Sequence, residues 1–218
     1  MENNDQLTPK DVISTVIEAG IGAIPYIGGP IQTVYFGLQN EKRFKRIEAF
    51  YVQLNKEMEL VKSLIPGSIN EDSQDQLVAI IETINSEVEQ IKNRDKIVYF
   101  VTSFKNVLLS VDQNNLDMEE YFVDILSSLR SIDLDVLIYL FRRPEAKSYG
   151  GMSVPQVGDL DQNIVGGILN RLVDFSLVRR NLRGMTIGGS GGDSSNYAYY
   201  ISDYGINFCR YILETKTV

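Results

Sequence analysis

The side chains that most enzymes use for catalysis are scarce in this chain of 218 residues. It contains no histidine and a single cysteine, Cys209. The absence of histidine excludes Ser-His-Asp and Cys-His nucleophile pairs and all histidine-based metal sites. A single cysteine excludes an internal disulfide and a zinc or iron–sulfur site built from several thiolates. Any chemistry would therefore have to come from carboxylates, lysine, tyrosine or serine.

These remaining side chains do not form a recognisable catalytic set. The carboxylate pairs Glu57/Glu59 and Glu119/Glu120 fall on polar faces of predicted helices, where solvated surface is the usual reading. The pattern Gly20-x-Gly22 has no third glycine and precedes no strand–helix unit, which argues against a dinucleotide site. We assign no catalytic residue, no metal site and no cofactor, and we predict that the protein is not an enzyme.

Charge divides the chain into two parts. The 29 acidic and 21 basic side chains give a formal net charge of −8. Residues 1–130 hold 12 basic and 20 acidic side chains, whereas residues 131–218 hold nine of each. We therefore predict two domains, 1–130 and 131–218, with different surfaces. The N-terminal sequence lacks a basic region followed by an apolar one, so we expect no signal peptide and a cytoplasmic protein.

Residues 12–38 are the most apolar stretch, with Glu18 as their one charge. The stretch is long enough to cross a bilayer, and a basic cluster follows it. Two prolines and several glycines, however, interrupt a continuous helix. We predict a soluble apolar hairpin over residues 12–40, and a membrane-active segment is the alternative. The turn of this hairpin contains Pro25, Gly28, Gly29 and Pro30.

Two heptad patterns follow, and each predicts a helix with an apolar seam. A proline, a glycine and a polar segment separate them, so the sequence predicts an antiparallel pair of helices joined by a short turn. The first seam consists of Phe44, Ile47, Tyr51, Leu54, Met58, Val61 and Ile65. The second consists of Leu77, Ile81, Ile84, Val88 and Ile91.

Two further helices complete the predicted N-terminal bundle. Residues 96–111 are apolar on nearly all sides, which is typical of a helix buried among others. The helix over 116–130 carries its apolar face on Tyr121, Phe122, Ile125, Leu126 and Leu129. We therefore predict a mainly α protein whose residues 1–130 form a helical bundle.

The C-terminal part is predicted to mix helices with two strands. Ser131 is a candidate N-cap for a helix over 132–142, and Ser153-Val154-Pro155 is expected to open a short helix. Asp159 or Asp161 would cap a longer helix that ends near Phe175. A strand at 177–180, a Gly/Ser loop at 188–196, a strand at 197–201 and a final helix at 204–213 complete the order.

This order, the helix DQNIVGGILNRLVDFSLV and the returning segment YAYYISDYGINF resemble the winged-helix family of helix-turn-helix domains. The resemblance implies an α+β fold for residues 131–218. It also implies that the third helix and the wing carry the binding surface. On the third helix the corresponding residues are Gln162, Asn163, Gly166, Gly167, Asn170 and Arg171, and on the wing they are Arg179, Arg180 and Arg183.

The same residues bear on the kind of partner. The third helix has one basic and two acidic side chains, whereas DNA binding draws on lysine and arginine that neutralise phosphates. Gly166-Gly167 costs about 1 kcal/mol per residue relative to alanine in a helix, which suggests close approach of another backbone. We therefore favour a protein partner, with a DNA-binding transcription regulator as the alternative.

The N-terminal segment GAIPYIGGPIQTVYF and the basic cluster at 42–46 resemble a segment of uncharacterised bacterial and phage-borne proteins linked to phage defence. This resemblance implies a setting and no mechanism. We expect a non-enzymatic bacterial or phage protein whose winged helix binds a macromolecular partner. A membrane-active effector acting through residues 12–38 is a further alternative, and a homo-oligomer is compatible with each.

Overall fold

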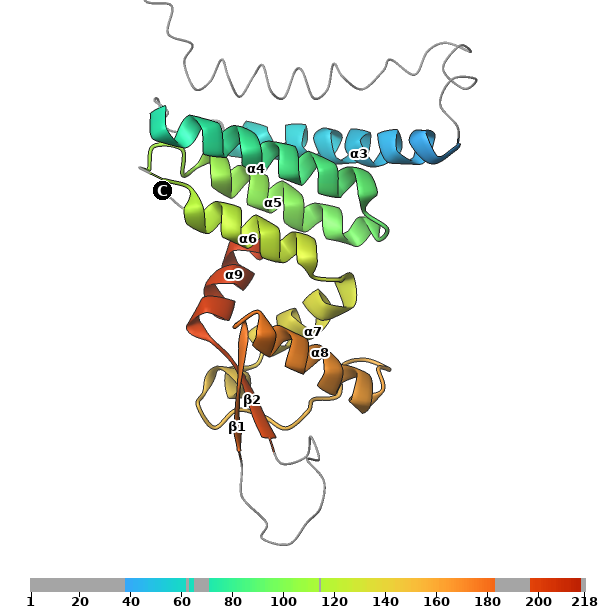
Figure 1. Cartoon of the computed structure of the whole chain (residues 1–218), viewed down its shortest axis with the longest axis vertical. Coiled ribbons are helices and arrows are strands. Elements are labelled where there is room, and N and C mark those ends of the chain that lie inside the picture. The colour runs from blue at the N-terminus through green and yellow to red at the C-terminus, as the bar shows by residue number, and fades with distance from the viewer. Residues whose placement is uncertain (1–37, 62, 65–70, 114, 183–196, 217–218) are drawn as a thin grey trace, which may run out of the picture. The chain divides into compact units, whose positions relative to one another are not determined.

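The computed structural model describes residues 38–61, 63–64, 71–113, 115–182 and 197–216. Within these ranges the protein is mainly α-helical, with seven α-helices and one two-stranded antiparallel sheet (Figure 1). The chain divides into two compact units. Unit 1 comprises Met1–Ser127 together with Glu214–Val218, and unit 2 comprises Ser128–Leu213. Unit 2 is thus inserted into the sequence of unit 1, an arrangement that the two-part charge pattern did not suggest.

Unit 1 contains four of the α-helices and a short 3₁₀ helix. These are α3 (Leu38–Val61), α4 (Glu71–Gln90), η1 (Arg94–Lys96), α5 (Ile97–Leu108) and α6 (Asp117–Ser128). Helices α3, α4 and α5 lie side by side and contact one another pairwise (Figure 1). This is a helical bundle.

Helices α3 and α4 run antiparallel, because contacts between them pair the residues in reverse order. Arg46 Nη1 donates a hydrogen bond to the carbonyl oxygen of Glu89 at 2.8 Å, and Tyr51 Oη donates to Asn85 Oδ1 at 2.8 Å. All five residues of the second predicted seam are buried, although Ile91 lies just past the end of α4. Tyr51 and Leu54 of α3 are also buried, while Ile47 is half-buried. Ile65 and the side chains of Phe44, Met58 and Val61 lie outside the described part.

Helix α5 is the centre of unit 1, as its apolar composition predicts. Every residue of α5 except Val98 and Tyr99 is buried. Phe104 meets Phe50 of α3 edge to face, with ring centroids 6.0 Å apart. On α6 the predicted inner face is correct for Phe122, Ile125 and Leu126, but Tyr121 is exposed.

Unit 2 packs three helices against the sheet. Its elements are α7 (Ser131–Phe141), η2 (Pro144–Lys147), α8 (Gln162–Asp174), β1 (Val178–Leu182), β2 (Tyr197–Ile201) and α9 (Asp203–Leu213). Strands β1 and β2 are antiparallel, with Val178 opposite Ile201 and Leu182 opposite Tyr197. A single bridge adds Met152 to the far side of β2, where Met152 and Tyr199 exchange two backbone hydrogen bonds of 2.8 Å.

Two local predictions in unit 2 are wrong. Ser131 does not cap α7. Arg130 occupies the N-cap position, and the Asp133 carboxylate in the first turn accepts its N–H at 2.9 Å. The short helix expected to open at 153–155 is also absent, since residues 153–160 form bends and turns.

The physical reason for this irregular segment is local. The Gln156 amide donates to the carbonyl oxygens of Gly158 at 2.8 Å and Leu160 at 3.1 Å, and Gly158 has a φ of 52°. A side chain that binds nearby carbonyls competes with helical hydrogen bonds. A positive φ also ends any helical run.

Several predictions fall outside the described residues. They are the hairpin over 12–40 with Pro25, Gly28, Gly29 and Pro30, except for its last three residues, which begin α3, as well as Arg183 and the loop at 188–196. Among the helices that the structure describes, none combines the length and the apolar character needed to cross a membrane.

Candidate partner-binding surface

Helix α8 carries most of the predicted contact residues. The Asp161 carboxylate caps it by accepting the Asn163 N–H at 2.8 Å. Apolar side chains at spacings of four and three, on Val165, Leu169 and Leu172, are buried in unit 2. Their burial leaves another face of the helix exposed. Of the predicted contact residues, Gln162, Asn163, Gly167 and Asn170 are exposed, Gly166 is buried and Arg171 is half-buried.

The adjacent glycines of α8 are not required by a close contact within the described part of the chain. A Cβ atom built on Gly166 or on Gly167 meets no heavy atom within 4 Å. Alanine would favour the helix by about 1 kcal/mol at each position. The expected close approach of another backbone is therefore not made by the described residues of this chain.

Arg171, predicted to reach a partner, is held within unit 2. Its Nη2 donates to the carbonyl oxygen of Ser128 at 2.8 Å, and its Nε lies 3.5 Å from Asp133 Oδ2. Asp133 is fully buried, and its Oδ1 accepts no hydrogen bond in the described part of the chain. A buried carboxylate needs a nearby positive charge. Arg171 supplies that charge together with Arg130, whose Nε lies 3.4 Å from the same oxygen, and Arg171 so joins α8 to the start of α7.

The two wing arginines differ in their surroundings. Arg180 Nη1 donates to Asn170 Oδ1 at 3.1 Å, and its guanidinium lies 5.2 Å from the centre of the Tyr197 ring. Two predicted contact residues, Arg180 and Asn170, thus bind each other and link β1 to α8. The side chain of Arg179 is exposed and forms no hydrogen bond or ion pair with other described residues. Its cross-strand neighbour is Tyr200.

Sequence reasoning missed several exposed apolar side chains of unit 2. Tyr149 is 77% exposed, Leu182 is 62% exposed and Ile164 is 52% exposed. The Tyr149 ring lies 5.5 Å from that of Tyr200, and Asn181 Nδ2 donates to the Tyr149 carbonyl oxygen at 2.9 Å. Ile164 and Val165 are adjacent apolar residues of α8, and Val165 is buried whereas Ile164 is exposed. The apolar spacing of α8 does not show which member of that pair faces outward.

The segment that closes the sheet, Ile201–Gly205, has a packing explanation. Ser202 Oγ donates to the carbonyl oxygen of Ser176 at 2.7 Å and accepts the Gly205 N–H at 2.9 Å. A Cβ on Gly205 would lie 2.1 Å from the carbonyl oxygen of Leu177. The serine caps α9, and the glycine allows α9 to approach the residue before β1 closely.

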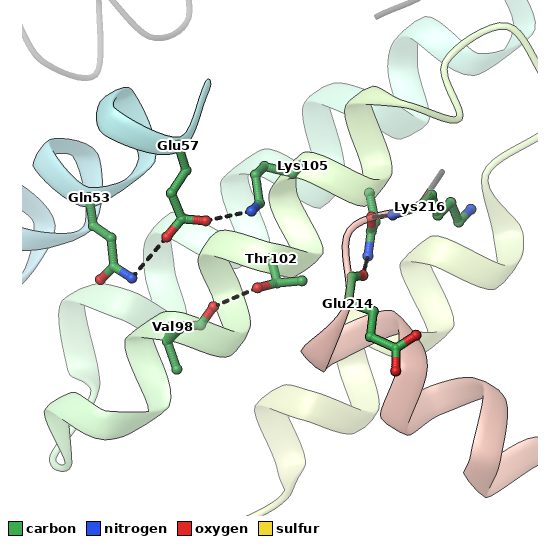
Figure 2. A network of polar contacts seen from close by, with 8 residues as sticks. Gln53, Glu57, Val98, Thr102, Lys105, Glu214 and Lys216 are labelled. Carbon is green, nitrogen blue, oxygen red and sulfur yellow. Dashed lines mark hydrogen bonds and ion pairs between the residues drawn. The ribbon is translucent and has the colours of Figure 1, made fainter. Parts of the chain in front are cut away.

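The carboxylates considered for chemistry form structural pairs instead. Glu57 of α3 faces Lys105 of α5 and forms an ion pair with it, while Gln53 Nε2 donates to Glu57 at 3.2 Å (Figure 2). Glu119 is buried whereas Glu120 is exposed, so these neighbours do not share a site. The side chain of Glu59 lies outside the described part.

The ion pair makes the contribution of Glu57 to stability dependent on pH. Burial would raise the pKa of Glu57, but the hydrogen bonds from Lys105 and Gln53 and the lysine charge outweigh burial and lower it below 4.5. A lowered folded-state pKa adds stability above the unfolded pKa, and that stability is lost as the pH falls through the folded pKa. Glu57→Gln should therefore cost about 1–3 kcal/mol of unfolding free energy at pH 7. This deficit should shrink below about pH 4.

Urea unfolding between pH 3 and pH 7 measures this difference. The control is Glu82→Gln, since Glu82 is exposed and forms no ion pair with described residues. A deficit for Glu57→Gln that stays constant across this range would contradict the ion pair as its cause.

The remaining candidate nucleophile is buried. Cys209 is fully buried in α9, and burial raises the pKa of its thiol far above the usual range, despite an opposing effect of Lys147. A neutral, enclosed thiol is a packing residue. The described residues contain no group of three or more carboxylates and thiols placed to hold a metal ion.

Comparisons of the chain with protein-family models, with curated proteins and with solved structures found no match.

Proposed function

We propose that the protein is a non-enzymatic binding protein, and that unit 2 is a winged-helix domain that contacts a protein partner through α8 and the strands. The order of α7, the Met152 bridge, α8, β1, β2 and the Ser202–Gly205 closure supports the winged helix. Residues 153–160 depart from the family pattern, since they form turns where its second helix would lie.

We favour a protein partner because of the residue types on the exposed face of α8. This face presents Gln162, Asn163, Gly167 and Asn170, which are uncharged, and the acidic Asp174, while Arg171, the one basic residue of α8, forms an ion pair with Asp133. DNA binding gains most of its affinity from basic side chains placed at phosphates. A helix face without a free basic side chain, with exposed Ile164 beside it, suits a protein surface better.

One observation favours the DNA-binding alternative. Arg179 is exposed on β1 without an intramolecular partner among the described residues, so it is available to a phosphate. The membrane-active alternative and most of the segment that links the chain to phage defence rest on residues before α3, which lie outside the described part of the chain, while the basic cluster at 42–46 lies in α3.

Site-specific crosslinking in the full chain tests the proposal. A photoreactive benzoylphenylalanine is placed at Asn163 of α8, and in a control chain at the exposed Glu82 of α4. After irradiation in cells of the source organism, we expect a discrete protein adduct at position 163 that withstands nuclease treatment. We expect no such adduct at position 82.

The competing outcome is measured with the same protein. Fluorescence anisotropy with a labelled mixed-sequence DNA duplex is recorded at low and high salt for wild type and for Arg179→Glu. Tight binding that falls steeply with salt and is lost in Arg179→Glu would replace the protein partner by DNA. The same protein adducts at positions 163 and 82 would refute α8 as the contact surface.

A further inference from the structure

The segment that follows α9 returns to unit 1 and binds there through its backbone. Asn106 of α5 is fully buried and contacts this segment. Its Nδ2 donates to the carbonyl oxygen of Glu214 at 2.9 Å, and its Oδ1 accepts the N–H of Lys216 at 2.8 Å. One amide side chain thus satisfies the two backbone groups on either side of Thr215. Figure 2 shows the Glu214 carboxylate directed away from this contact, so Asn106 binds the backbone of Glu214 and not its side chain.

One side chain of the segment also binds to unit 1. Lys216 Nζ lies 2.6 Å from Glu119 Oε1 of α6 and donates to Ser110 Oγ at 2.6 Å. The Glu119 side chain is 6% exposed, and no other basic side chain of the described residues is within ion-pair distance of it. A buried carboxylate without a counter-charge is costly. Unit 1 therefore contains a receptor site whose buried carboxylate, Glu119, has a counter-charge only when a lysine occupies the site.

We propose that α5 and α6 form a binding site for an extended, lysine-bearing segment, and that the chain's own residues 214–216 fill it as a displaceable strap. Three buried polar groups, on Asn106, Ser110 and Glu119, make up the receptor, and each contacts the segment. A local helix or strand cannot supply these contacts, because the partners are separated by 97 to 110 residues in sequence.

The strap has a topological consequence. The chain leaves unit 1 after Ser127 and re-enters it at Glu214. With the strap bound, unit 2 is joined to unit 1 at both of its ends, and with the strap released it is joined at one.

Charge reversal in the full chain tests the ion pair. Lys216→Glu and Glu119→Lys should each lower the urea midpoint of unit 1, and the double variant should recover a large part of the loss. The control is Lys92→Glu, which changes an exposed lysine of unit 1 by the same charge. Losses that simply add in the double variant would overturn the proposed pairing.

A peptide added in trans tests the binding site itself. The probe is a labelled peptide with the sequence of residues 213–218, acetylated and amidated at its ends. We expect it to bind the Lys216→Glu chain at least about tenfold more tightly than wild type, because the native strap competes at a high effective concentration. The same peptide with glutamate in place of lysine should bind only the Glu119→Lys chain, where the receptor carries a positive charge and the native Lys216 is repelled.

Two outcomes would overturn the strap. One is a lysine peptide that fails to bind a Lys216→Glu chain whose circular dichroism is that of wild type. The other is equal binding of the lysine and glutamate peptides to that chain. If Lys216→Glu does not fold, Lys216→Ala takes its place, because it opens the site without adding a second carboxylate beside Glu119, and the same two outcomes apply.

Discussion

Gly205→Ala is expected to destabilise unit 2 by about 3 kcal/mol or more, although alanine is the better helix former. The new Cβ would lie 2.1 Å from the carbonyl oxygen of Leu177 and 2.9 Å from Ile201 Cγ1. The first contact is with backbone, so no rotamer change relieves it. To make room, α9 would have to move away from Leu177, and the Ser202 hydrogen bonds at this point would be strained.

The matched control is Gly167→Ala in α8, where the same substitution should have the opposite sign. No atom lies within 4 Å of a Cβ at this position, so the helix should gain about 1 kcal/mol of unfolding free energy. Urea unfolding measures the change in unfolding free energy for each variant. Hydrogen exchange of α8 and α9 shows which helix is affected. A stable Gly205→Ala protein with unchanged exchange in α9 would contradict the close approach.

The control also bears on function. If Gly167→Ala stabilises the protein, then folding does not account for glycine at that position. Loss of the crosslinked partner in this more stable variant would show that the glycine at position 167 serves binding.

The fold was largely predictable where burial follows a local period. The apolar spacings of α4 and α8 locate both helices, and Leu77, Ile84 and Leu169 are buried as those spacings require. β2 spans the predicted strand at 197–201, although its residues are not buried in strict alternation. Periodicity reports what one element needs from its surroundings, and the two helices obey it.

The candidate site was less predictable, because its contacts are tertiary. The sequence of α8 does not show that Arg171 neutralises Asp133, which lies on a different helix. Asn170 and Arg180 are both polar residues of predicted surface, yet they bind each other. Lys216 and Glu119 are 97 residues apart and carry no local signature. Such pairings depend on how the helices pack, which residue types alone do not specify.

Phe50→Ala is expected to have the largest effect in unit 1, a loss of about 3–5 kcal/mol of unfolding free energy. Phe50 is fully buried on α3, and its ring packs edge to face against Tyr51 and Phe104, with centroids 5.1 Å and 6.0 Å away. Removing the ring leaves a cavity between α3 and α5 and forfeits both aromatic contacts. The regular heptad seam omitted Phe50, since the seam passes through its neighbour Tyr51.

Val52→Ala is the matched control for this change, because Val52 lies two residues away on the same helix and is half exposed. Its loss should stay within about 0.5 kcal/mol. Urea unfolding monitored by circular dichroism measures both variants, and hydrogen exchange shows whether the loss is confined to α3, α4 and α5. Similar losses for the two variants would mean that α3 packs on unit 1 through a broader face than Phe50, Tyr51 and Leu54 define. In that case the ring contact between α3 and α5 is not what holds α3 in the bundle.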